Sequence, residues 1–139
     1  MPRLELVVDA SPLISALLGG QALKLLYSPL FLFATTERTT WEVKKYIPEI
    51  AERLEISEIE ILETFEDFPL VAYQSNLYSS ALSRARNKIG LRDPKDVDIL
   101  ALAYHLGTPL WTQDLDLIDI EDIQTITTQD LLTIIATNE

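Results

Sequence analysis

The chain of 139 residues contains no cysteine and only one histidine, His105. Without cysteine it can form neither disulfides nor thiolate metal sites, and a single histidine excludes the zinc sites that several histidines build. Any metal ion bound by this protein must therefore be held mainly by oxygen atoms.

Positive charge is also scarce, since 11 Lys and Arg stand against 22 Asp and Glu and give a net charge of −11. Taken alone, this balance argues against nonspecific affinity for nucleic acid, because phosphate contacts need cations. Most of the cations nevertheless fall in two segments beside acidic residues, Arg84, Arg86, Lys88, Arg92 and Lys95 in one, and Arg38, Lys44 and Lys45 in the other. They are either solvated helix faces or a local phosphate-binding rim, in which Arg84, Arg86 and Lys88 are the candidate substrate-binding residues.

Long apolar runs are missing as well. The longest, such as 13–18 and 27–35, are too short or too interrupted to span a bilayer, and no signal-peptide pattern precedes them. With 47% hydrophobic residues, the chain can bury an ordinary core. We expect one domain over residues 1–139, in a soluble cytoplasmic protein without membrane contact.

The most informative stretch runs from Asp93 to Asp116. Apolar residues recur there with helical spacing at Ile99, Leu102, Ala103 and Leu106, and Gly107 follows as a stop. Asp93 or Asp96 is expected to cap the start of this helix. A short buried strand, 110–112, comes next, and Asp114 follows its end.

The rest of the chain alternates in the same way. Strands are predicted over 4–8, 31–34, 68–73 and 124–127, and helices over 21–27, 75–89 and 129–136, with further helices between them. Ser11 is the expected N-cap of the first helix, with Pro12 at its first position. Strands that alternate with helices indicate an α/β fold with three layers and a mainly parallel central sheet.

Four acids stand at equivalent places in this pattern. Asp9 and Asp114 each follow a predicted strand, and Glu42 and Asp96 each lie near the start of a helix. On a parallel sheet these positions can converge on one edge, where ligands bind. Clustered carboxylates without His or Cys select Mg²⁺ or Mn²⁺, which activates water and stabilises the oxygens of phosphoryl transfer.

These motifs together resemble the PIN domain family, the fold of many toxin-type, VapC-like ribonucleases. The resemblance is carried by Val7-Val8-Asp9-Ala10-Ser11, by Glu42, and by Asp96-x-x-Ile-Leu-Ala-Leu-Ala followed by Gly107 and Pro109-Leu-Trp-Thr-x-Asp-x-Asp116. It implies a metal-dependent endoribonuclease whose ligands are Asp9, Glu42, Asp96 and Asp114, with Asp116 as an accessory metal ligand. Ser11 and Thr112 match small polar positions beside the site, where they would contact substrate.

The resemblance also implies RNA as substrate, a homodimer, and a small antitoxin partner. A catalytically weak PIN-fold module that binds RNA or protein is the main alternative. A receiver domain and a haloacid-dehalogenase-like phosphatase are disfavoured, because the first strand is followed by neither an acid pair nor Asp-x-Asp.

Several neighbouring residues have ordinary structural interpretations. Asp98 cannot easily share a metal with Asp96, because residues i and i+2 point to different sides of a helix. His105 is expected to be an exposed helix residue rather than a catalytic one, and Trp41 and Trp111 are expected to lie in the core rather than to serve as base-stacking platforms.

Overall fold

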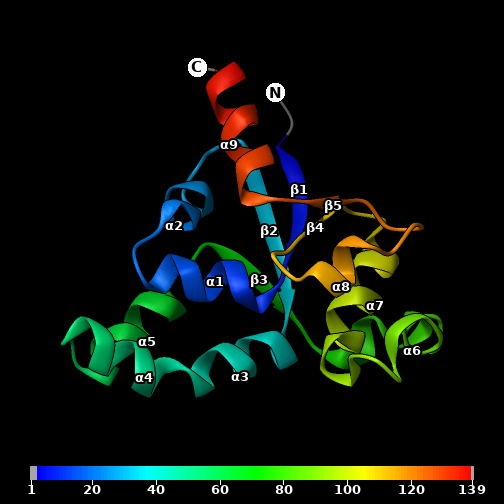
Figure 1. The fold of residues 1–139 in the computed structure, drawn as a ribbon, viewed down its shortest axis with the longest axis horizontal. Coiled ribbons are helices and arrows are strands. Elements are labelled where there is room, and N and C mark those ends of the chain that lie inside the picture. Colours follow the sequence, from blue (N-terminus) through cyan, green and yellow to red (C-terminus); the bar gives the residue numbers. More distant parts are fainter. Residues whose placement is uncertain (1–2, 139) are drawn as a thin grey trace.

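The computed structural model describes residues 3–138 and contains one sheet of five parallel strands (Figure 1). The strands are β1 (Leu4–Val8), β2 (Phe31–Thr36), β3 (Leu70–Tyr73), β4 (Leu110–Trp111) and β5 (Thr125–Ile126), in the order β3-β2-β1-β4-β5. Every pair in this sheet is parallel, which confirms the predicted α/β fold.

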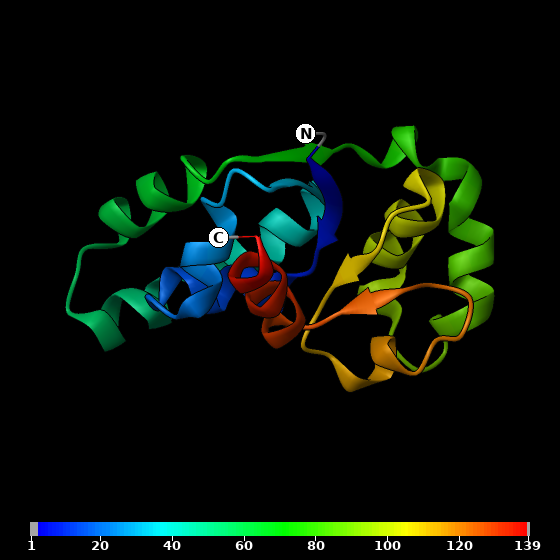
Figure 2. The same ribbon diagram turned by 90° about the horizontal axis from the view of Figure 1, so that it is seen from above.

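Helices cover both faces of the sheet, as Figure 2 shows from above. One layer contains α1 (Ala10–Leu17), α2 (Gln21–Leu26), α3 (Glu37–Lys45), α4 (Ile47–Leu54), α5 (Glu58–Glu66) and α9 (Thr128–Thr137). The other contains α6 (Leu82–Ile89), α7 (Val97–Leu106) and α8 (Leu115–Ile118), with the 3₁₀ turns η1 (Ser75–Leu77), η2 (Ser79–Ala81) and η3 (Pro94–Asp96). The fold therefore has the three predicted layers.

The position of β1 in the middle of the sheet explains why its sequence is mostly apolar. Leu6 and Val8 pack into the core under α1 and α2, whereas Val7 packs into the core under α7. Successive side chains of a strand point to opposite faces, so a strand covered on both sides must be apolar throughout.

Within residues 3–138, none of the helices has both the length and the apolar character that a membrane span requires.

Three local predictions are wrong. The first helix begins at Ala10, and its N-cap is Asp9 rather than Ser11. Neither Asp93 nor Asp96 caps a helix through its side chain, although both stand at the N-cap positions of η3 and α7. The helix predicted over 75–89 is instead two 3₁₀ turns followed by α6.

The side of β1 on which successive strands are added changes between β3 and β4, so the sheet has a switch point between β1 and β4. The chain adds β2 and then β3 on one side of β1, and β4 and then β5 on the other. Val7 and Val8 pair with Leu110 and Trp111, so the carboxyl ends of the two strands lie side by side. A crevice at such a switch point is where ligands bind in open α/β sheets.

Gly107 ends α7 in the left-handed conformation, with φ of +61°. It turns the chain from α7 into β4, as the sequence predicts. A Cβ atom added there would meet no atom within 4 Å. Only backbone strain therefore opposes a side chain at this position.

We expect Gly107→Ala to lower the free energy of unfolding by about 1 kcal/mol, because an L-residue other than Asn or Asp is strained at positive φ. Gly107→Asn should lose less, since Asn tolerates this conformation. Chemical denaturation measures both variants. Equal stability of the two would show that φ at this position does not limit stability.

Candidate metal centre

Three carboxylates from distant parts of the sequence meet at the carboxyl edge of the sheet. Asp9 follows β1, Asp96 ends η3 just before α7, and Asp114 follows β4. One oxygen from each lies within 4.8 Å of the others, and we name these residues the acidic triad. The structure thus brings together three of the four predicted catalytic acids.

Asp9 is fixed in place by two hydrogen bonds. The backbone N–H of Ala10 donates to Oδ1 at 2.8 Å, and the hydroxyl of Thr112 donates to Oδ2 at 2.8 Å. Burial nevertheless raises the pKa of Asp9, since desolvation outweighs these two bonds, and the nearby charges of Asp114 and Glu42 add to the rise.

Thr112 connects two members of the acidic triad. Besides donating to Asp9, its hydroxyl accepts a hydrogen bond from the backbone N–H of Asp114 at 3.0 Å. Thr112 has 0% of its surface exposed, so it offers nothing to a substrate. The predicted substrate contact is therefore corrected to a positioning role.

Asp96 is the member whose charge is least compensated. It is only 4% exposed, and its Oδ2 atom is buried without a hydrogen-bond partner. Burial, followed by the charge of Asp9 and contact with Asp114, raises the pKa of Asp96 to about 8. Among the described residues, no Lys or Arg forms an ion pair with the triad.

The donor set of the triad fits a hard divalent cation. It consists of carboxylate oxygens alone, which Mg²⁺ and Mn²⁺ prefer. A buried carboxylate oxygen without a donor also needs a positive partner. A cation held by Asp9, Asp96 and Asp114 would provide that partner.

Glu42 stands at the edge of this arrangement. It lines a hollow of about 300 Å³ together with the triad, Ser11 and Tyr46, but it is not part of the triad's close cluster. Its carboxylate lies 3.6 Å from the Nε atom of Arg38. Ser11 accepts a hydrogen bond from the backbone N–H of Gln113 at 3.3 Å, so it joins the start of α1 to the segment that follows β4.

A second acidic cluster shares Asp114 with the triad. One oxygen from each of Asp93, Asp114 and Asp116 lies within 4.8 Å of the others. Contact with Asp116 raises the pKa of Asp93. Asp93 was predicted only as a helix cap, so its contact with Asp114 and Asp116 was not predicted. The three-residue spacing between Asp93 and Asp96 across a proline turn was the available sign of it.

Asp98 and the three other residues with ordinary structural interpretations lie outside the site. Asp98 accepts a hydrogen bond from the hydroxyl of Tyr78 at 2.5 Å, which together with burial raises the pKa of Tyr78. His105 is exposed and Trp111 is fully buried, as predicted. Trp41 is 50% exposed, so its predicted place in the core is wrong.

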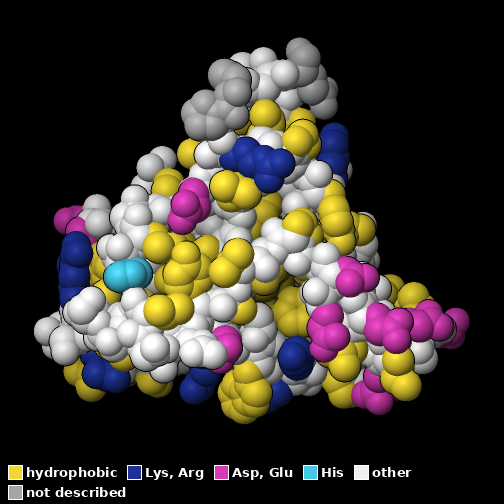
Figure 3. All heavy atoms as spheres, turned by 180° about the vertical axis from the view of Figure 1, so that it is seen from behind, with side chains coloured by type: hydrophobic (Ala, Val, Ile, Leu, Met, Phe, Trp, Pro, Cys, Tyr) yellow, Lys and Arg dark blue, Asp and Glu magenta, His cyan; other side chains and the backbone are white. Residues whose placement is uncertain are grey.

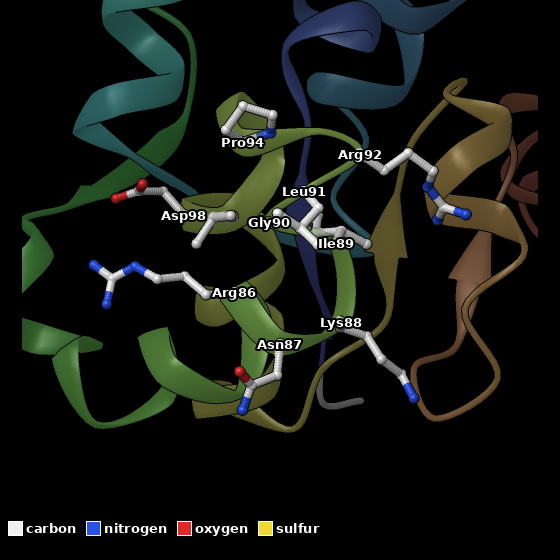
Figure 4. Close-up of a pocket in the computed structure, with 10 residues that line it drawn as sticks. Arg86, Asn87, Lys88, Ile89, Gly90, Leu91, Arg92, Pro94 and Asp98 are labelled. Carbon is white, nitrogen blue, oxygen red and sulfur yellow. The ribbon is translucent and has the colours of Figure 1, made fainter.

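The predicted cationic rim lies only partly at the site: Lys95 lines the acidic hollow and the Nε atom of Arg92 lies 3.9 Å from Asp116, whereas the candidate substrate-binding residues lie elsewhere. Arg84 and Lys88 lie 3.1 and 3.8 Å from Asp122, and the Arg84 guanidinium stacks on Tyr104. Arg86 and Lys88 line another hollow, of about 660 Å³, in which Arg86 points toward Asp98 while Lys88 points away from it (Figure 4). None of the three lines the acidic hollow.

The PIN domain family matches residues 7–133 of the chain. The chain belongs to this family. Its fold is also similar to that of one chain in the crystal structure of VapBC2 from Rickettsia felis bound to a DNA fragment from their promoter. That match has 13% sequence identity and a TM-score of 0.67, and covers 89% of this chain and 98% of that chain. No curated protein matches the sequence.

The acidic hollow therefore lies at the switch point of a PIN domain. The three strand and helix ends that supply the triad all fall within the matched residues. Two clusters of carboxylates that could bind a metal ion meet there, and they share one residue.

We expect Thr112→Val to weaken Mn²⁺ binding about tenfold, because loss of a residue that orients a ligand typically costs 10–100-fold in metal affinity. Titration calorimetry with Mn²⁺ measures the effect. Thr108→Val is the matched control, since Thr108 is also buried and its hydroxyl donates to the carbonyl of Leu106 at 3.2 Å, before β4 rather than after it. Similar affinity losses in both variants would contradict the positioning role.

We expect Asp96→Asn to stabilise the metal-free protein at pH 8 by a few degrees of Tm. The folded chain keeps a proton on Asp96 up to about pH 8, whereas an ordinary Asp loses it near 3.8. The folded state thus binds more protons between these values, so wild-type stability falls as pH rises through this window.

Thermal unfolding from pH 4 to pH 9 checks this effect, with Asp119→Asn as the control at an exposed acid outside the clusters. The advantage of Asp96→Asn should vanish toward pH 4. Mn²⁺ should stabilise the wild type and the control far more than this variant. A variant less stable than wild type at pH 8 without metal would refute the electrostatic account.

Proposed function

We propose that this PIN domain is a metal-dependent endoribonuclease that hydrolyses RNA phosphodiesters. The observation that carries the proposal is the buried, unpartnered Oδ2 atom of Asp96 inside the acidic triad. Natural proteins rarely leave a buried carboxylate oxygen unpaired without a functional reason. A cation supplies that reason.

Each acid has a distinct part in the proposal. Asp9, Asp96 and Asp114 hold Mg²⁺ or Mn²⁺, and the two hydrogen bonds of Thr112 hold Asp9 and Asp114 in position. Asp116 reaches the same region through the second cluster, where it is an accessory metal ligand. When bound, the cation would lower the pKa of a water molecule and stabilise the oxygens of the phosphate.

Glu42 lines the same hollow without joining the triad, so it is available to act on water rather than to hold the cation. We assign it the catalytic task of orienting the attacking water. Ser11, partly buried at the rim, is left to contact the substrate.

The proposal also includes a toxin role, a small antitoxin partner and a homodimer. These parts are supported by the likeness of the fold to a chain in the VapBC2 complex. The catalytically weak binding module is the competing function, and the same assay separates the two.

We expect single-stranded RNA to be cleaved with Mg²⁺ or Mn²⁺ and spared with EDTA. Asp9→Asn and Asp96→Asn should each reduce the rate at least 100-fold, because each removes a charge that holds the cation. Asp119→Asn should cleave at the wild-type rate, since Asp119 is exposed and belongs to neither acidic cluster.

Gel analysis of end-labelled RNA, with folding checked by circular dichroism, measures these rates. Cleavage that survives both triad substitutions would exclude this centre. Absence of cleavage in every preparation, with RNA binding retained, would favour the binding module.

A further inference from the structure

The outer face of α3 exposes a large aromatic side chain. Trp41 is 50% exposed, whereas Thr39 and Val43 on the opposite side of the helix are buried at 3% and 0%. Successive residues of a helix are 100° apart, so Trp41 points away from the core that Thr39 and Val43 face. Trp41 is thus half exposed, and packing against the core does not explain a large aromatic side chain at this position.

Two cations flank this ring. The Nζ atom of Lys45 lies 3.9 Å from the ring centroid, and the guanidinium carbon of Arg38 lies 5.0 Å from it. Acidic side chains gather on α4 and α5 (Figure 3), but within residues 3–138 neither cation pairs with them: Arg38 pairs only with Glu42, and Lys45 forms no ion pair. This spot is therefore locally positive on a strongly acidic protein.

The adjoining side of α3, about 140° around the helix from Trp41, borders the acidic hollow. Arg38 contacts Trp41 on one side and Glu42 on the other, with its Nε atom 3.6 Å from the Glu42 carboxylate. Tyr46, at the end of α3, is 47% exposed and lines the hollow itself. We call Arg38, Trp41, Lys45 and Tyr46 the α3 surface.

We propose that the α3 surface binds single-stranded RNA and leads it to the acidic triad, with one base stacked on Trp41 and another on Tyr46. This inference rests on the proposed function and adds the substrate-binding residues to it. Interleaved aromatic and basic side chains are the usual means of binding single strands. The bases of an RNA duplex are already stacked and paired, so duplex RNA cannot use these rings.

Magnitudes favour stacking over the cation contacts already present. An exposed cation–π contact strengthens an association only about 2- to 5-fold, whereas base–aromatic stacking contributes about 5- to 150-fold per base. A base therefore displaces Lys45 from the ring. The freed ammonium group then pairs with the adjacent phosphate.

The arrangement of acids limits the route of the strand. The hollow on the other side of Trp41 is lined by two acids, Glu37 and Glu66, and one cation, Lys44, so its net charge repels phosphate. The α6 cations are a weaker alternative, because Arg84, Arg86 and Lys88 neither line the acidic hollow nor, among the described residues, form an ion pair with a residue that does. The proposed strand therefore passes Arg38 and Lys45 toward the hollow, whose wall adds Lys95.

The two tryptophans make the test direct. Trp41 is half exposed and Trp111 is fully buried, so a ligand that stacks on the α3 surface can quench only Trp41. An Asp96→Asn protein, which leaves the RNA intact, is titrated with a ten-nucleotide single-stranded RNA and with its duplex. Single-stranded RNA should quench the fluorescence, and the duplex should bind at least tenfold more weakly.

Binding of dye-labelled RNA in the same background separates stacking from charge. Trp41→Leu and Tyr46→Leu should each weaken binding about tenfold, while Trp41→Phe and Tyr46→Phe should stay within about threefold of the parent. Tyr27→Leu is the control, since Tyr27 is 55% exposed at the end of α2 and lines no part of the acidic hollow. Thermal unfolding establishes that each variant is folded.

Binding by Trp41→Leu within twofold of the parent, or no RNA binding by the parent, would overturn the inference. Binding that is equally weakened by Tyr27→Leu would do so as well. Cleavage by the otherwise wild-type enzyme distinguishes the two proposals. Unchanged KM in Trp41→Leu would refute the α3 surface and leave the nuclease intact, whereas stacking without any cleavage would refute the nuclease alone.

Discussion

The parallel pairing of β1 with β4 is the contact on which the acidic site depends. It sets Val8 beside Trp111, so the residues that follow each strand emerge next to one another at the switch point of the sheet. Asp9 comes from one strand and Thr112 from the other, and their hydrogen bond spans 103 positions of sequence. Neither residue has a fixed orientation without the other strand. A slip of one residue in this register would move Thr112 to the opposite face and separate it from Asp9.

The triad concentrates negative charge where water is excluded. Desolvation raises the pKa of both Asp9 and Asp96, and each carboxylate also raises that of its neighbours. The metal-free fold therefore carries a destabilised site, which is a common property of functional centres. The same repulsion becomes affinity when a divalent cation is present. Under the proposed function, a bound cation would reverse the local field, which would let a PIN domain with a net charge of −11 accept a phosphodiester.

Prediction from the sequence succeeded for elements with strong local patterns and failed where packing decided. The strands and the left-handed stop at Gly107 both follow from local residue chemistry. The helix over 75–89 was wrong, because its first turns form 3₁₀ structure before α6 begins. Trp41 was placed in the core on hydrophobicity alone. Its position opposite Thr39 and Val43 puts it on the surface.

The sequence by itself determined the order of strands and helices, the acids at their ends, and the choice of oxygen ligands. Those properties depend on neighbours in the chain, on periodicity, and on the absence of cysteine. The tertiary structure alone decided that Thr112 is buried as a link between carboxylates, that Asp93 joins Asp116, and that Arg84 and Lys88 of α6 turn toward Asp122. These facts depend on which distant segments pack together, and one sequence read alone carries no record of that packing.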